Sequence, residues 1–151
     1  MLEIALYQPD IAPNAATILR MCACFGITCR IIEPAGFVLT DSAFRRAGMD
    51  YLDRAALVSE PSWPAFRQST AGRRSVLLTT RSTLPYTEFA FRPDDVILMG
   101  RESSGVPAAV HAAVEARLTI PMRQGLRSLN IAMACAMVTG EALRQLRSFP
   151  H

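Results

Sequence analysis

The sequence predicts an α/β protein with a parallel six-stranded sheet flanked by helices. Short runs of β-branched and apolar residues alternate with stretches of helical pattern, and this alternation is typical of a parallel sheet covered on both faces. The 151 residues, half of them hydrophobic, are enough for one ordinary domain with a sizeable core. Since no repeat, low-complexity segment or linker interrupts the pattern, we expect residues 1–151 to form a single domain.

The first part of the chain contains two predicted strands and two predicted helices. LEIALY (2–7) is the first strand, and a helix follows over 14–25, where Gly26 can end it. CRIIE (29–33) is the second strand. DSAFRRAG (41–48) has an aspartate that can cap a short helix and a glycine that can stop it.

The rest of the chain supplies the other four predicted strands. They are AALVSE (55–60), SVLLTT (75–80), VILMG (96–100) and RLTIP (117–121). We expect helices around 63–68, after Pro107 and, as the longest element, over 129–146.

Composition excludes several kinds of chemistry. All sixteen basic residues are arginine, so no lysine can form a Schiff base, anchor pyridoxal phosphate or serve a Walker-type phosphate loop. With only His111 and His151, a histidine-based triad or a metal site is not expected. A net charge of +3 carried by arginine suits RNA phosphates, although a genome biased toward arginine codons would give the same count.

Other bulk features indicate a cytoplasmic protein with no membrane segment. MLEIALYQPD has no basic n-region, and the longest apolar run, IAMACAMV (131–138), is far shorter than the roughly 20 residues that span a bilayer. The four cysteines have no framework spacing, so we expect reduced thiols. CFGITCR (24–30) has the spacing of a phosphatase loop, but its cysteine ends a helix and precedes a strand, which is the reverse of the required context.

The end of the first strand is the first of three segments that contain more glycines, prolines and polar residues than the fold alone requires. Ligands of parallel sheets collect at the carboxyl ends of strands, so these ends are where a site is expected. In YQPDIAPNAATILR (7–20), two prolines stiffen the loop, Asn14 can cap the helix, and Arg20 lies further along it. An ordinary capped helix with a surface arginine explains this stretch by itself.

The second segment, GRESSGVP (100–107), follows a strand built for the core. Its glycines allow close backbone approach or a positive φ, and Pro107 can restart the chain as a helix. It matches neither the dinucleotide pattern G-x-G-x-x-G nor a phosphate loop, which needs a lysine. A capped turn accounts for the glycines and the proline but leaves Glu102 without a purpose.

The third segment, IPMRQGLRSLN (120–130), combines a bend with apolar residues. Gln124 and Gly125 offer the bend, and Ser128 or Asn130 can cap the long helix. Its apolar side chains around free main-chain amides suit an adenine ring.

Together the three segments resemble the SPOUT superfamily of RNA methyltransferases, most closely the small TrmL (YibK)-like enzymes that 2′-O-methylate the wobble nucleotide of certain tRNAs. The family patterns are LYxPxIPxNxGNIxR, GPETRGLP and IPMxxxxRSxNLS. Here they read LYQPDIAPNAATILR, GRESSGVP and IPMRQGLRSLNIA, and the resemblance spans essentially the whole chain. EALRQL (141–146) also matches the end of the family's last helix.

The resemblance implies a C-terminal deep trefoil knot, a homodimer with active sites at its interface, and S-adenosylmethionine as methyl donor, without a metal. The donor would be held by residues from the strand ends, namely Leu78, Gly100, Glu102, Ile120, Met122, Ser128 and Leu129.

The resemblance also implies roles in catalysis and RNA binding. Arg20 matches the family arginine at the reacting hydroxyl, and Ser128 and Asn130 match residues beside it. Contacts with tRNA would come from Asn14, Arg20, Arg45 and Arg46.

Departures from the family patterns leave alternatives open. Ser104 replaces the arginine of ETRG, Arg101 replaces the preceding proline, and Gly140 replaces a tyrosine associated with substrate handling. A non-catalytic RNA-binding protein of the same fold would tolerate such changes, and so would a 2′-O-methyltransferase acting on another tRNA or rRNA position. A small flavodoxin-like electron carrier is a third alternative for the function.

Overall fold

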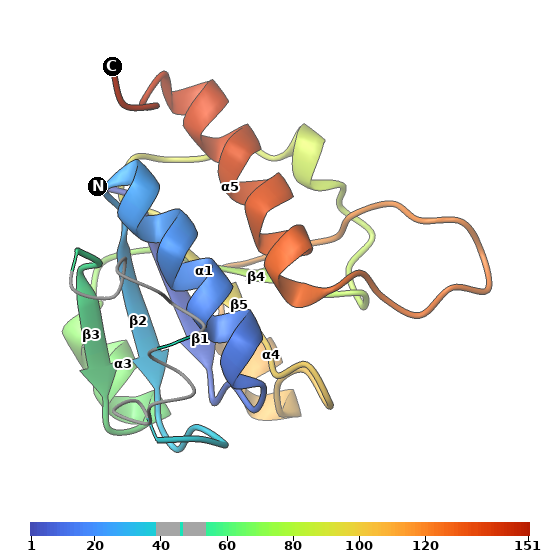
Figure 1. The fold of residues 1–151 in the computed structure, drawn as a ribbon. Coiled ribbons are helices and arrows are strands. Elements are labelled where there is room, and N and C mark those ends of the chain that lie inside the picture. Colours follow the sequence, from blue (N-terminus) through green and yellow to red (C-terminus); the bar gives the residue numbers. More distant parts are fainter. Residues whose placement is uncertain (39–45, 47–53) are drawn as a thin grey trace.

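A computed structural model describes residues 1–38, 46 and 54–151 of the protein. A six-stranded sheet in the order β3-β2-β1-β5-β4-β6 forms its centre, and every pairing between neighbours is parallel. Its strands are β1 (Glu3–Tyr7), β2 (Thr28–Ile32), β3 (Leu57–Glu60), β4 (Ser75–Leu78), β5 (Val96–Met99) and β6 (Ala116–Leu118). The predicted parallel α/β sheet is confirmed (Figure 1).

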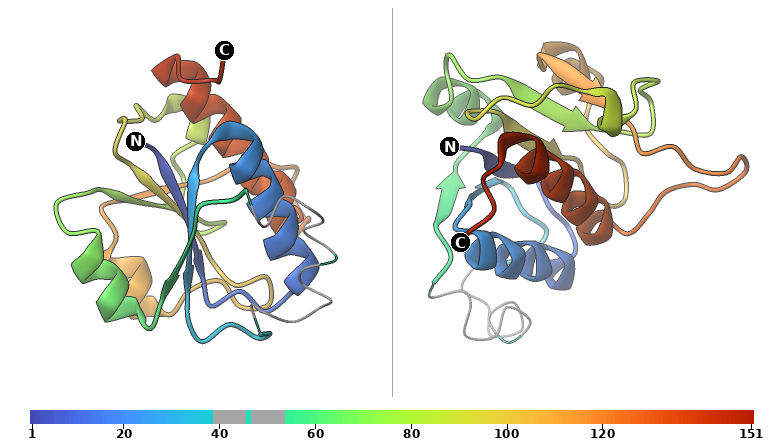
Figure 2. Two further views of the ribbon diagram at one scale, coloured as in Figure 1. Left: turned by 60° about the vertical axis from the view of Figure 1, so that its left-hand side comes forward. Right: turned by 90° about the horizontal axis from the view of Figure 1, so that it is seen from above.

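Helices cover both faces of the sheet, as Figures 1 and 2 show. The helical elements are α1 (Ala12–Phe25), α3 (Trp63–Ser69), η2 (Tyr86–Glu88), α4 (Ala108–Ala113) and α5 (Ile131–Leu146). The long helices α1 and α5 lie side by side on one face, and the shorter α3 and α4 lie on the other.

Alternating side chains of the central strands build the two cores. Ile4 and Leu6 of β1 pack into the cluster that contains α1 and α5, whereas Ala5 and Tyr7 face the cluster built around Phe66 of α3. A strand buried on both faces needs apolar residues at every position, because successive side chains point to opposite sides. This requirement explains why β5 and residues 4–7 of β1 read as continuous apolar runs.

The start of α1 differs from the prediction. The helix begins at Ala12, its N-cap is Ile11 without a side-chain hydrogen bond, and Pro13 lies in the first turn. Proline needs no amide partner there and its fixed φ favours the helix, so the turn forms before Asn14 and Asn14 does not cap it. The predicted stop is confirmed, since Gly26 adopts a left-handed conformation with φ 66°.

The predicted C-terminal elements are shorter in the structure. β6 ends at Leu118, and Thr119 forms an isolated parallel bridge with Pro85. Of the two predicted caps of α5, Asn130 is confirmed: its side chain accepts hydrogen bonds from the amides of Ala132 and Met133, at 2.9 and 3.3 Å. The helix predicted over 41–48 lies outside the described residues except for position 46, which is helical.

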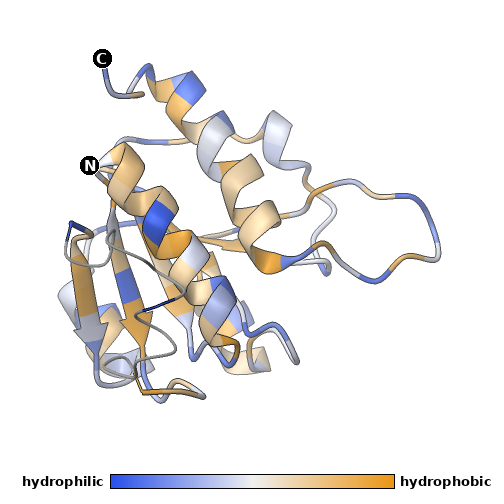
Figure 3. Cartoon of the chain, viewed as in Figure 1, coloured by the Kyte–Doolittle hydropathy of each residue, from blue (hydrophilic) through white to orange (hydrophobic). Residues whose placement is uncertain are grey.

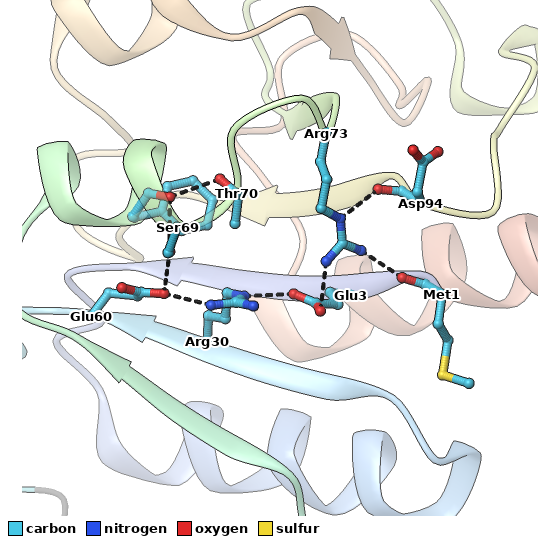
Figure 4. A network of polar contacts seen from close by, with 9 residues as sticks. Met1, Glu3, Arg30, Glu60, Ser69, Thr70, Arg73 and Asp94 are labelled. Atoms are coloured by element: carbon cyan, nitrogen blue, oxygen red, sulfur yellow. Dashed lines mark hydrogen bonds and ion pairs between the residues drawn. The ribbon is translucent and has the colours of Figure 1, made fainter.

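A chain of ion pairs crosses the sheet surface away from the loops discussed below (Figure 4). Arg30 of β2 bonds to Glu3 and Glu60 at 2.5 Å each, and Arg73 contacts Glu3 at 2.6 Å. Arg73 also donates to the carbonyls of Met1 and Asp94. Burial of these groups is tolerable because each charge has a hydrogen-bonded partner of opposite sign.

Among the described residues, no helix is both long enough and apolar enough to cross a membrane.

Candidate active site

A cavity of about 510 Å³ lies where β4, β5 and β6 end. These strands are neighbours in the sheet, so their carboxyl ends and the loops that follow them meet at one edge. The wall comprises residues 77–81 at the end of β4, 99–106 at the end of β5, and, after β6, Thr119, Ile120, Met122 and residues 127–129, with the first turns of α5. The connection from β6 to α5 extends away from the body of the molecule (Figure 1).

The turn after β5 is closed on itself by its backbone. The Arg101 amide donates to the Gly105 carbonyl and the Gly105 amide to the Arg101 carbonyl, both at 2.9 Å. A Cβ at Gly100 would lie 2.9 Å from the Gly105 backbone, and Gly105 itself has φ +66°. Glycine is therefore required at Gly100 by close approach and at Gly105 by conformation.

The segment after β6 is held at its start and at its end. The Thr119 amide donates to the Leu84 carbonyl and the Tyr86 amide to the Thr119 carbonyl, both at 2.9 Å. The predicted bend is confirmed at Gly125, which has φ +86°. At the far end, the Asn130 side chain caps α5 and donates to the side-chain oxygen of Asn14 at 3.1 Å. This last bond joins the start of α1 to the start of α5.

The structure brings the predicted donor-binding residues together. Every one of them lines the cavity: Leu78, Gly100, Glu102, Ile120, Met122, Ser128 and Leu129. Residues from three separate loops, several of them apolar, therefore surround one space, as in small-molecule sites.

The other predicted residues lie outside this lining. Asn14 and Asn130 contact each other at the edge between α1 and α5, and Arg20 is an exposed residue of α1. Arg46 is exposed, and Arg45 lies outside the described residues. The structure of one chain therefore does not bring Arg20 into the cavity with Ser128.

Sequence reasoning missed the partner of Glu102, which is Asp10. The Asp10 amide donates to Glu102 Oε2 at 3.2 Å, and Ser103 Oγ donates to Asp10 Oδ2. Burial and the neighbouring Asp10 raise the pKa of Glu102, whereas the hydrogen bonds from Glu102 and Ser103 lower the pKa of Asp10. Glu102, which a plain turn leaves unused, thus connects the loops after β1 and β5.

Further polar groups of the lining were also missed. His111 of α4 lines the cavity, and its Nε2 is buried without a hydrogen-bond partner within the described chain. Arg81, Arg101 and Arg127 add positive charge to the wall. Arginines at this edge favour anionic groups such as a carboxylate or a phosphate. No group of three or more histidine, cysteine or acidic side chains in ranges 1–38 and 54–151 is arranged to hold a metal ion.

Comparison with known proteins agrees with this geometry. The profile of the SpoU rRNA Methylase family matches residues 1–140. A protein of Beijerinckia indica named tRNA (cytidine(34)-2′-O)-methyltransferase is 61% identical over 145 residues, which are 95% of this chain and 91% of that protein.

Solved structures share the fold. One from a study of the 2-OH methylation of C/U34 on tRNA superposes with a TM-score of 0.93 at 38% identity, covering 97% of each chain. The SpoU methyltransferase AviRb of Streptomyces viridochromogenes, solved in complex with AdoMet, gives a TM-score of 0.85 at 23% identity over 98% of this chain and 61% of its own.

Proposed function

The chain belongs to the SpoU rRNA Methylase family, and we propose that it is an S-adenosylmethionine-dependent tRNA 2′-O-methyltransferase that modifies the ribose of nucleotide 34. The observation that carries this proposal is the single cavity formed by three loops that are far apart in sequence, in a chain 61% identical to a relative named for that reaction. Residues 1–151 would act as one methyltransferase domain.

The cavity fits a nucleoside methyl donor. A volume of about 510 Å³ falls within the usual range for small-molecule sites, roughly 300–1,000 Å³. Ile120, Met122 and Leu129 would cover the adenine ring, and main-chain groups of the turn at Gly100 would fix its orientation. The donor, when bound, supplies an electrophilic methyl group on a sulfonium.

The reaction is a displacement at carbon in which the chain supplies positioning and charge. The ribose O2′ forms a bond to the methyl carbon, the bond from that carbon to sulfur breaks, and the hydroxyl proton leaves O2′. The protein must bring the hydroxyl to within about 3–3.5 Å of the methyl group. Ser128, at the cavity wall, and Asn130, which fixes the start of α5, are suited to hold this edge.

Arg20 would stabilise the negative charge that develops on O2′. A guanidinium is a donor that does not act as a base in proteins, so Arg20 would act as an electrostatic group and an RNA phosphate would help to accept the proton. Since Arg20 is exposed on α1 and absent from the cavity wall of its own chain, it would act with Asn14, Arg45 and Arg46 on RNA bound across the surface.

A second copy of the chain would complete the site. Met133 and Met137 lie one turn apart on α5 and are 61% and 41% exposed, and Leu129 at the cavity wall is 37% exposed. Figure 3 shows that the first turns of α5 are hydrophobic. Exposed apolar side chains on one helix face favour burial against a partner, and α1 with Arg20 belongs to the same layer.

We also propose that the C-terminal segment is threaded as a deep trefoil knot. The contacts of α5 support it: on one side the helix packs on α1, and on the other Gln145 bonds to the connection between β4 and β5. Gln145 donates to the Phe89 carbonyl at 2.9 Å and accepts from the Phe91 amide at 3.0 Å. A cytoplasmic location would follow from a tRNA substrate.

Mass spectrometry of tRNA nucleosides tests the function. Unmodified tRNA incubated with the protein and S-adenosylmethionine should gain one 2′-O-methyl group, which fragment mapping should assign to nucleotide 34. Arg20→Ala should abolish transfer but leave donor binding intact by calorimetry, whereas Arg92→Ala, another exposed arginine outside the cavity wall, should leave transfer unchanged. Donor binding without methylation of any tRNA or rRNA would refute the proposal.

A further inference from the structure

Asp10 is held in place by backbone contacts from the loop after β2. The Gly36 amide donates to the carbonyl of Pro9 at 2.8 Å, and a Cβ at Gly36 would lie 2.9 Å from the Asp10 Cα. Any larger residue at position 36 would push Asp10 away. The loop after β1 is therefore fixed independently of the turn after β5.

One side-chain oxygen of Asp10 lacks a donor among the described residues. Oδ2 accepts from Ser103 and lies 3.9 Å from Arg101 Nε, which is beyond hydrogen-bond distance, while Oδ1 is buried with no hydrogen-bond partner. A buried carboxylate oxygen without a donor is costly. Glu102 lies beside it, since Glu102 Oε2 accepts the Asp10 amide at 3.2 Å.

A proton on Glu102 resolves this arrangement. Two carboxyl groups in contact can form a hydrogen bond only if one of them is protonated. Burial and the nearby Asp10 raise the pKa of Glu102, whereas hydrogen bonding from Glu102 and Ser103 and the charge of Arg101 lower the pKa of Asp10. A proton shared by the pair would therefore lie on Glu102 and be donated to Asp10.

We propose that Asp10 is a positioning residue for methyl-donor binding: through a proton shared with Glu102 it holds the 100–105 turn against the cavity, and donor binding takes up a proton at this pair. The inference rests on the proposed function, because it assigns the cavity to S-adenosylmethionine. Asp10 does not line the cavity, so its effect reaches the donor through Glu102 and the turn.

The direction of the pH dependence follows from burial. Because Glu102 lines the cavity, a bound ligand would shield its carboxyl group from water, which would raise its pKa again and favour the protonated pair. The contact exists below this raised pKa and is lost as pH rises through it, when two neighbouring carboxylates repel each other. Donor affinity should then fall, by about tenfold for each unit by which the Glu102 pKa differs between bound and free protein.

Calorimetry with S-adenosylhomocysteine in buffers of different ionisation enthalpy measures this proton uptake directly. The unaltered protein should take up a fraction of a proton on binding and lose affinity with rising pH. In Asp10→Asn the new amide can donate to an ionised Glu102 at any pH, so both proton uptake and pH dependence should disappear. In Glu102→Gln the side-chain amide donates to Asp10 at every pH, so proton uptake and pH dependence should disappear here too. This variant supplies the test if Asp10→Asn fails to fold.

Ser103→Ala tests whether the carboxyl pair alone takes up the proton: it removes a bond to Asp10 but keeps the pair, so proton uptake should be retained even where donor affinity changes, since Ser103 lines the cavity. Binding by the unaltered protein without proton uptake, or uptake that persists in Asp10→Asn, would overturn the positioning role alone. Failure of the unaltered protein to bind S-adenosylhomocysteine or S-adenosylmethionine at all would instead overturn the proposed function, and the inference with it.

Discussion

Replacing Gly100 by alanine should separate the two arms of the turn after β5. The added Cβ would lie 2.9 Å from the Cα and carbonyl carbon of Gly105 and 3.3 Å from its oxygen, whereas ordinary contacts begin at 3.4 Å. The opposing atoms are backbone, so the arms must move apart by about half an ångström, the gap between these contact distances. The reciprocal bonds between Arg101 and Gly105, now 2.9 Å long, would lengthen accordingly.

The expected cost combines overpacking with a damaged cavity wall. Overpacking of this kind costs about 1–3 kcal/mol of stability. Since the turn lines the cavity, we expect S-adenosylhomocysteine affinity to fall by roughly 10- to 100-fold, equivalent to about 1.4–2.8 kcal/mol. Thermal unfolding and calorimetry on the same sample measure both quantities.

Gly72→Ala is the control that separates stability from binding. Gly72 has φ +84°, and a Cβ there would meet no atom within 4 Å. Alanine at this position pays only for the left-handed conformation, about 1–2 kcal/mol, far from the cavity. It should lower stability comparably and leave donor affinity unchanged. If Gly100→Ala binds as tightly as the unaltered protein, the close approach does not shape the cavity and our reasoning is wrong.

Three further predictions concern stability. Arg30→Ala should destabilise the protein by about 3–5 kcal/mol in urea unfolding, because Glu3 and Glu60 lose their shared cation. Arg30→Met should recover part of this stability. Equal losses in the two variants would contradict the prediction. Asn130→Ala should cost about 1 kcal/mol through the lost cap, and an unchanged melting temperature would count against the cap. Burial raises the pKa values of the Glu3 and Glu115 carboxyl groups, but their arginine partners outweigh it and hold both below the usual 4.5. The stability that these ionised carboxylates provide is therefore present above that pH and should decline as the pH falls. The decline should be less steep in Glu115→Gln.

The order of apolar, glycine and proline residues predicted the strands and helices because these elements form through interactions between residues close in sequence. The apolar run of β1 is needed for burial on both faces, and Gly26 marks the helix end because it tolerates positive φ. The first turn of α1 was misplaced because Asn14 is a good cap in general, but Pro13 nucleates the turn earlier. Which of the two residues determines the start of the helix depends on the conformation of the whole loop before α1.

The site depends on contacts that sequence spacing does not encode. Resemblance identified the residues of the cavity wall, but the pairing of Asp10 with Glu102 joins positions 92 apart. It exists only because β1 and β5 are neighbours in the sheet, an order that alternating patterns leave open. His111 was considered only as a ligand or catalytic base, and its burial at the wall follows from the position of α4.

The contacts of Arg73 in Figure 4 lie at the edge of the sheet opposite the cavity. Arg73 and Asp94 precede β4 and β5, whereas the cavity is built from residues that follow the same strands. Arg73 ties the amino ends of these strands to β1 at the edge opposite the cavity. Substitutions in the loops that follow the strands can therefore reshape the cavity wall while the register of the sheet is retained.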